Sequence, residues 1–148
     1  MHRVYIACSQ RTPIMDEKDM KDHNPQATED NHPARIFTVD ELTTFGIDLL
    51  TAVGADPEEA KAVTTELVTA DMAGHPSHGV MRLLQYVRFM EEGMIKPGAR
   101  LTVVRESLGV DVFDGHYGFG QYLMRELLEI AYSKARRYGT YTAFARDF

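Results

Sequence analysis

The chain has 148 residues, of which 44% are hydrophobic and 26% charged, proportions typical of one soluble globular domain. Its formal net charge is -6 and no block of lysines and arginines stands out, which argues against a nucleic-acid-binding protein. No apolar run approaches the roughly 18 residues that a membrane span needs, and the single cysteine, Cys8, cannot form an internal disulfide. We therefore expect a cytoplasmic protein that binds neither nucleic acid nor membrane.

Residues 1–35 differ in composition from the rest of the chain. Charged residues and prolines crowd the stretch from Thr12 to Arg35, and large apolar residues are scarce there. Such a segment buries too little surface to offset its ordering entropy, so we predict a disordered extension. Leader sequence from an early start codon is the alternative.

Two helices are predicted next, and each is opened by a capping box. In the first, Thr38 can cap the opening turn while Glu41 reaches back, and Gly54 is the expected terminator. In the second, Asp56 is the cap and Glu59 completes the box. Apolar residues follow each box at helical spacing: Leu42, Phe45, Leu49, Leu50 and Val53 in the first helix, and Ala60, Val63, Leu67 and Val68 in the second.

A third helix is predicted from Ser77 to about Glu92, and it carries the most informative pattern in the chain. His78, Arg82 and Tyr86 follow one another at steps of four, and each step advances the helical angle by only about 40°. The three polar side chains therefore share one stripe. The apolar residues between them can hold this stripe against a core: Val80, Leu83, Leu84 and Val87. A proton-transfer group beside a guanidinium suits a small substrate that carries a carboxylate.

Strands are predicted after this helix. Leu101–Arg105 and Val110–Asp114 are β-prone and are joined by a link of hairpin length. A fourth helix is expected to begin near Gly118 and to end at Gly139, and residues 140–145 then alternate like a strand that enters a sheet. That strand either pairs with the hairpin in a three-stranded sheet or belongs to the front part of a longer protein, and we favour the second interpretation.

Each residue of the stripe also has a structural interpretation. His78 suits general acid–base catalysis because free histidine has a pKa of about 6.5, and a surface or capping histidine is the alternative. Arg82 can clamp a carboxylate through two parallel hydrogen bonds, or it can pair with an acid such as Glu91. Ser77 and Tyr86 can bind substrate by hydrogen bonds, or serve as a helix cap and a half-buried core aromatic.

Three further patterns could suggest a functional site, and for each of them we favour an interpretation without such a site. His75 and His78 lie three residues apart, but Pro76 between them and the lack of a nearby third ligand argue against a metal site. Gly118-Phe119-Gly120 does not follow the long apolar strand of a dinucleotide-binding fingerprint, so we interpret it as a helix start where small residues permit close packing. His116 is interpreted as a solvated loop histidine.

The segment Ser77-His78-Gly79-Val80-Met81-Arg82 resembles the type 2 malate/L-lactate dehydrogenase family, which includes ureidoglycolate, sulfolactate and diketogulonate oxidoreductases. Ala70-Asp71 precedes it at the family's usual distance. Gly93-Met94-Ile95-Lys96-Pro97 is similar to the family's Gly-x-Ile-x-Pro turn, and the stretch from Asp114 to Gln121 is similar to its Asp-Gly-x-x-Gly-x-Gly-Gln element. The match covers about residues 36–146.

The resemblance implies an α/β (α+β) fold, in which an N-terminal helical bundle leads into a mixed, non-Rossmann sheet like that of L-sulfolactate dehydrogenase. It also implies an oxidoreductase that moves a hydride between a small 2-hydroxy acid and NAD or NADP, in a homodimer. His78 matches the family's catalytic position, and the positive end of its helix would favour the neutral imidazole. Ser77, Arg82 and Tyr86 are the candidate substrate-binding residues, and we assign no metal ligand and no cofactor-binding residue.

Family chains are well over twice this length, so we predict a truncated N-terminal part of such an enzyme. Residues 36–148 would form its helical region and the start of its α/β core. The family's Asn-x-Asn-His-Phe-Gly segment would normally follow the last strand, where this sequence has Arg146-Asp147-Phe148. We therefore expect the isolated chain not to be catalytically competent. The alternative is a non-catalytic remnant that acts at most as a helical self-association module.

Overall fold

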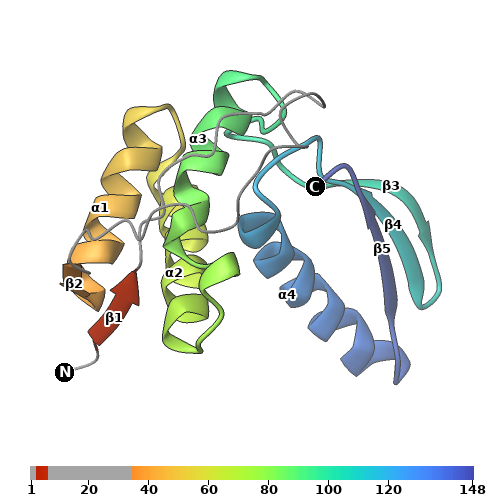
Figure 1. Cartoon of the computed structure of the whole chain (residues 1–148). Helices are drawn as coiled ribbons and strands as arrows, with labels where there is room; N and C mark the ends of the chain where they lie inside the picture. Colours follow the sequence, from red (N-terminus) through yellow and green to blue (C-terminus); the bar gives the residue numbers. More distant parts are fainter. Residues whose placement is uncertain (1–2, 7–34) are drawn as a thin grey trace, which may run out of the picture.

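The structure is a computed structural model that describes residues 3–6 and 35–148 (Figure 1). The predicted disordered extension falls mostly on residues 1–2 and 7–34, which lie outside the described residues. Strand β1 (Arg3–Ile6) pairs antiparallel with β2 (Arg35–Thr38).

Helices α1 (Val39–Ala52) and α2 (Pro57–Met72) confirm the first two predicted helices. Both capping boxes form, and in the first the Glu41 N–H donates to the Thr38 hydroxyl at 3.2 Å while the Thr38 N–H donates to the Glu41 carboxylate at 2.7 Å. The two helices pack closely at Gly46, because a Cβ there would lie 2.5 Å from Thr64 Cγ2. Local capping therefore sets the ends of these helices, and a glycine sets how near they approach.

The predicted third helix is wrong over its first turns. The segment folds as two 3-10 helices, η2 (Pro76–His78) and η3 (Val80–Arg82), before α3 (Leu83–Glu91) begins. The break lies at Gly79, whose backbone is extended with φ -89° and ψ -162°. His78 therefore does not occupy the first turn of an α-helix, and the expectation that a helix dipole favours its neutral imidazole loses its basis.

A three-stranded mixed sheet follows, in the order β3-β4-β5. β3 (Thr102–Ser107) and β4 (Val110–Asp114) form the predicted antiparallel hairpin, and β5 (Thr142–Arg146) runs parallel to β4. Parallel neighbours need a crossover connection, which α4 (Gly120–Tyr138) provides. The last predicted strand thus pairs with the hairpin, and α4 lies between the helical group and the sheet (Figure 1).

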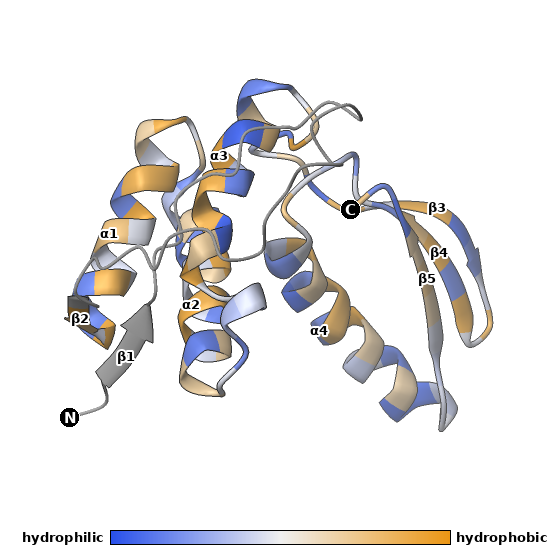
Figure 2. Cartoon of the chain, viewed as in Figure 1, coloured by the Kyte–Doolittle hydropathy of each residue, from blue (hydrophilic) through white to orange (hydrophobic). Residues whose placement is uncertain are grey.

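The main hydrophobic core lies among the helices. Figure 2 shows hydrophobic and hydrophilic residues interleaved along each helix, as amphipathic helices require. The buried core residues come from α1, the loop between α1 and α2, α2, η3, α3 and the segment before α4: Leu42, Leu50, Ala55, Ala60, Val63, Leu67, Val68, Val80, Leu83 and Phe119. No helix in the described part of the chain is long and apolar enough to cross a bilayer.

Candidate functional site

A cavity of about 710 Å³ lies where α2, η2, η3, α3 and the start of α4 meet. All three residues of the predicted stripe, His78, Arg82 and Tyr86, line it, although the backbone that carries them is not one continuous helix. Further polar side chains in the lining are Glu66, Gln85 and Gln121, and the apolar lining includes Leu67, Phe89, Met94, Ile95 and Phe148. The three side chains therefore share one cavity, although the continuous helical stripe that the spacing predicted does not form.

Asp71 holds the turn that carries His78. Its carboxylate accepts the N–H of Val80 at 2.8 Å, across the break between η2 and η3. A Cβ on Gly79 would lie 1.8 Å from Asp71 Oδ1, so only glycine leaves room for this carboxylate. In the sequence, Asp71 stood out only as part of the Ala70-Asp71 pair quoted for the family resemblance. A contact between residues nine positions apart in irregular backbone leaves no periodic pattern from which it could be predicted.

Ser77 is not among the residues that line the cavity, in contrast to its candidate role as a substrate-binding residue. Its hydroxyl instead contacts Nδ1 of His78 at 3.1 Å. This leaves Nε2 of the exposed His78 without a partner among the described residues. An imidazole with one nitrogen engaged and the other open can exchange a proton with a molecule in the cavity.

Arg82 is half-buried, and its Nη1 donates to Oε1 of Gln85 one turn further along. The considered pairing with Glu91 does not form, whereas the neighbouring Arg88 does pair with Glu92 at 2.7 Å. A guanidinium has five N–H donors in a planar fork. The remaining donors of Arg82 have no acceptor among the described residues, so they are available to a carboxylate in the cavity.

Tyr86 is held from two directions. Its ring stacks on Phe119 with a centroid separation of 6.2 Å and an interplanar angle of 29°. Its hydroxyl accepts a hydrogen bond from Nε2 of Gln121, in the first turn of α4. Gln85 and Gln121 are both site residues that the sequence reasoning missed, although Gln121 closes the glycine-rich element quoted for the resemblance.

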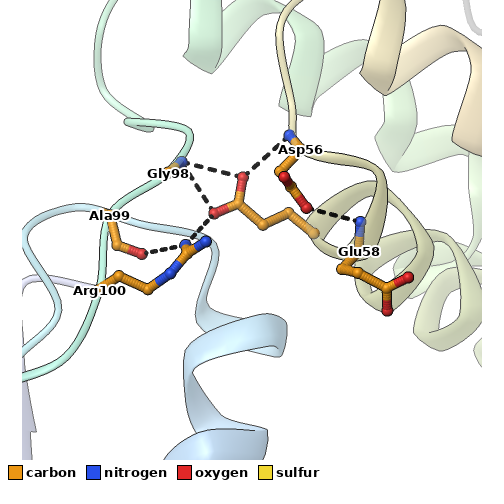
Figure 3. A network of polar contacts seen from close by, with 6 residues as sticks. Asp56, Glu58, Gly98, Ala99 and Arg100 are labelled. Atoms are coloured by element: carbon orange, nitrogen blue, oxygen red, sulfur yellow. Dashed lines mark hydrogen bonds and ion pairs between the residues drawn. The ribbon is translucent and has the colours of Figure 1, made fainter.

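The loop between α3 and β3 is tied to α2 by a buried carboxylate (Figure 3). Glu59 is fully buried and accepts the Gly98 N–H at 2.9 and 3.1 Å, Nη1 of Arg100 at 3.0 Å and the Asp56 N–H at 3.3 Å. The Arg100 guanidinium also lies over the Tyr122 ring at 5.1 Å from its centroid, which adds a contact to α4. These contacts position the loop that supplies Met94 and Ile95 to the cavity.

The glycine-rich loop before α4 is closely packed at Gly118, and both Gly118 and Gly120 also line the cavity. A Cβ on Gly118 would lie 2.8 Å from both Ala99 Cβ and Leu123 Cδ1. Close packing was the predicted role of Gly118-Phe119-Gly120, and Gly118 has such packing.

His116 lies outside the cavity lining, and it belongs to a polar group beside the sheet. Its Nε2 contacts Thr102 Oγ1 at 2.7 Å, and its side chain remains about half exposed at 49%. The His116 backbone N–H, together with Arg146, holds the pKa of Asp114 below its usual value. This group joins the start of β3 to the ends of β4 and β5.

A second ionic group lies on the sheet beside α4. Asp111 is fully buried and accepts hydrogen bonds from Lys134 at 2.5 Å, from the Tyr141 hydroxyl at 2.7 Å and from the Ser107 N–H at 3.1 Å. Burial opposes ionisation of this carboxyl, but these donors outweigh burial and hold its pKa below the usual range. Burial and the bond to Asp111 raise the pKa of Tyr141 to about 12.

The metal interpretation of His75 and His78 finds no third partner in the structure. Both histidines are exposed, and the described residues contain no group of three or more His, Cys, Asp or Glu side chains placed to hold a metal ion. The chemistry that the cavity offers is therefore that of an imidazole, a guanidinium and a phenol on one side of a partly apolar pocket.

Comparison with known proteins shows the family and the fold of the chain. A family model described as malate/L-lactate dehydrogenase matches residues 37–148. The malate dehydrogenase of Pyrococcus abyssi is 39% identical over 100 residues, which cover 68% of this chain and 28% of that protein. The L-sulfolactate dehydrogenase of Methanocaldococcus jannaschii is 35% identical over 101 residues, which cover 68% of this chain and 29% of that protein.

Solved structures give the same result for the fold. The malate dehydrogenase of Pyrococcus horikoshii OT3 superimposes with a TM-score of 0.69 at 35% identity, over 74% of this chain and 31% of that one. The chain thus spans less than one third of the length of these relatives. The mixed helix-and-strand architecture, the matched residues and the shared fold establish that the chain belongs to the malate/L-lactate dehydrogenase family.

Proposed function

We propose that this chain supplies the acid-binding and proton-transfer residues of an NAD(P)-dependent oxidoreductase that acts on the CH–OH group of a small 2-hydroxy acid of the malate or lactate type. The observation that carries the proposal is the lining of one cavity by His78, Arg82 and Tyr86. The relatives are malate and sulfolactate dehydrogenases, which supports the same substrate class.

The roles follow from the chemistry of each side chain. Arg82 binds the substrate carboxylate, because its free N–H donors can form paired, charge-assisted hydrogen bonds. His78 accepts the hydroxyl proton at Nε2 when the alcohol is oxidised and returns it when the carbonyl is reduced. Ser77 acts through His78, since its hydroxyl engages Nδ1 and so holds the ring orientation. Tyr86 contributes a hydrogen bond to a substrate oxygen.

NAD or NADP is the cofactor of this proposal, and the nicotinamide would supply hydride acceptance. No described residue is assigned to it. A homodimer and a cytoplasmic location complete the proposal, and they rest on the family resemblance and on the composition.

The proposal is tested by titrating the chain with oxamate, a stable analogue of a 2-oxo acid, and following the amide and imidazole signals by NMR. We expect binding with shifts at His78, and a loss of at least tenfold in affinity for Arg82→Ala, because charge-assisted hydrogen bonds are strong. Arg88→Ala is the matched control, since this arginine lies on the same helix but pairs with Glu92. Equal affinities for the Arg82 and Arg88 variants would contradict the proposal.

A second titration with NAD addresses the alternative of a non-catalytic remnant. Such a remnant binds no nicotinamide at millimolar concentration in calorimetry. Clear binding of NAD by the chain would count against the remnant and for the enzymatic interpretation.

A further inference from the structure

Two glutamines contact Arg82 and Tyr86, the two hydrogen-bond donors of the candidate site. One glutamine accepts a hydrogen bond and the other donates one. Gln85 uses its carbonyl oxygen to accept from Arg82, and Gln121 uses its amide N–H to donate to the Tyr86 hydroxyl. All four residues line the same cavity. Neither contact was visible in the sequence, and nothing in the proposed function requires Gln121.

The direction of the second contact determines what Tyr86 can do. A phenolic hydroxyl has one proton and two acceptor lone pairs. When the hydroxyl accepts from Gln121, its own proton stays free, and no acceptor for that proton lies among the described residues. The ring cannot swing away to find one, because Tyr86 is stacked on Phe119. The hydroxyl proton is therefore available to a ligand in the cavity.

We infer that Gln121 is a positioning residue that keeps the Tyr86 hydroxyl as a hydrogen-bond donor toward the ligand. Together with Arg82, this places two hydrogen-bond donors toward the ligand, while the Glu66 carboxylate that also lines the cavity pairs with Arg125 at 3.4 Å. The site therefore selects a ligand that presents acceptor oxygens to Arg82 and Tyr86. A 2-oxo acid fits such a site, whereas a 2-amino acid places a donor-only ammonium group against the phenol. The inference deepens the proposed function and rests on it for the identity of the ligand.

The first test needs no ligand. The Cζ carbon of a tyrosine shifts upfield in NMR when the hydroxyl accepts a hydrogen bond and downfield when it donates one. Gln121→Glu keeps the side-chain length but offers only acceptor oxygens, so Tyr86 must then donate to it, and we expect a downfield shift of Tyr86 Cζ. Met124→Glu is the control, because it adds the same charge at an exposed position of the same helix. An unchanged Cζ signal in the Gln121 variant would overturn the inference.

The second test is a double-mutant cycle with oxamate as the probe. Loss of one neutral hydrogen bond corresponds to about a fivefold loss of affinity, which we expect for Tyr86→Phe. Gln121→Met should give a smaller loss alone and no further loss in the Tyr86→Phe background, because Gln121 acts only through the hydroxyl. If the two losses of affinity multiply in the double variant, Gln121 contacts the ligand itself, which contradicts a positioning role.

The two proposals fail in different ways. If oxamate does not bind the unmodified chain, the proposed function fails, while the Cζ signal still decides the direction of the bond between Gln121 and Tyr86. If oxamate binds but the Cζ signal does not respond, the proposed function stands and the inference about Gln121 falls. L-alanine serves as the amino-acid comparison, and affinity equal to that of oxamate would also contradict the inferred selectivity.

Discussion

The helical part of the described chain and its strand part bury different kinds of groups. In the helical part, the buried core is almost entirely aliphatic, and α2 alone contributes Ala60, Val63, Leu67 and Val68. In the strand part, β3 is exposed along its whole length, and β4 buries two carboxyl groups, Asp111 and Asp114, beside Phe113. The helices are held by hydrophobic packing and the sheet largely by charge-assisted hydrogen bonds, so the two parts should respond differently to mutation and pH.

Each part nevertheless contains one fully buried carboxylate with several donors. Glu59 joins α2 to the loop before β3, and Asp111 joins β4 to α4 and to Tyr141. The cavity lies on the helical side, near the loop that Glu59 anchors. The comparison therefore separates contacts that shape the candidate site from contacts that only hold the sheet together.

The largest expected effect comes from removing the buried carboxylate of the helical part. Glu59→Ala leaves the N–H groups of Gly98 and Asp56 without their acceptor, and we expect the free energy of unfolding to fall by about 3 kcal/mol. Urea denaturation measures it. Glu58→Ala, one residue earlier and exposed, is the control and should change the value by less than about 0.5 kcal/mol. Similar losses for both variants would contradict the role of Glu59.

A smaller effect is expected at the turn that carries His78. Gly79→Ala forces a Cβ into the Asp71 carboxylate and should cost about 2 kcal/mol of unfolding free energy. It should also displace His78, which oxamate titration would register as weaker binding. Adding Asp71→Ala removes the clash, so the double variant should lose less stability than the two single losses combined. If the two losses of stability simply add, crowding between the new Cβ and the Asp71 carboxylate is not the cause of the loss in Gly79→Ala.

The strand part gives a prediction on pH. The folded-state pKa of Tyr141 is raised from 10.0 to about 12, so its stabilisation is complete below pH 10 and is lost as the pH rises from 10 toward 12. Asp111 has a lowered pKa, so its stabilisation is present above the ordinary aspartate pKa of 3.8 and is lost as the pH falls below 3.8. Urea midpoints measured across this pH range record both losses.

Tyr141→Phe isolates the alkaline part of that profile. It removes one donor to Asp111 and should lower the free energy of unfolding by about 1 kcal/mol at neutral pH. The variant should also lose less stability than the unmodified chain between pH 10 and 12. If the variant loses stability more steeply than the unmodified chain between pH 10 and 12, a group other than Tyr141 determines the alkaline stability of the sheet.

The smallest expected effect is a gain. Thr64 Oγ1 is buried between α1 and α2 and has no hydrogen-bond partner among the described residues. Thr64→Val keeps the shape and removes the unpaired hydroxyl, so we expect the free energy of unfolding to rise by about 1 kcal/mol. Thr65→Val, at the exposed neighbour whose hydroxyl donates to the Lys61 carbonyl at 2.7 Å, should bring no such gain. A loss at Thr64 would indicate that its hydroxyl is satisfied.

The sequence by itself determined the features that depend on neighbours a few residues apart. The capping boxes at Thr38 and Asp56 use contacts over three residues, and both formed as predicted. Such contacts recur wherever the local conformation recurs, because a side chain and the backbone one turn away always lie within reach. The hairpin of β3 and β4 and its turn also depend on neighbours a few residues apart.

Only the tertiary structure decided which distant groups meet. The carboxylate of Glu59 reaches Gly98 across 39 residues, and the amide of Gln121 reaches Tyr86 across 35. The break of the third helix at Gly79 also depends on Asp71, which arrives from the preceding helix. These contacts depend on how α2, α3 and α4 pack against one another, and packing of distant segments leaves no periodic signal in the sequence.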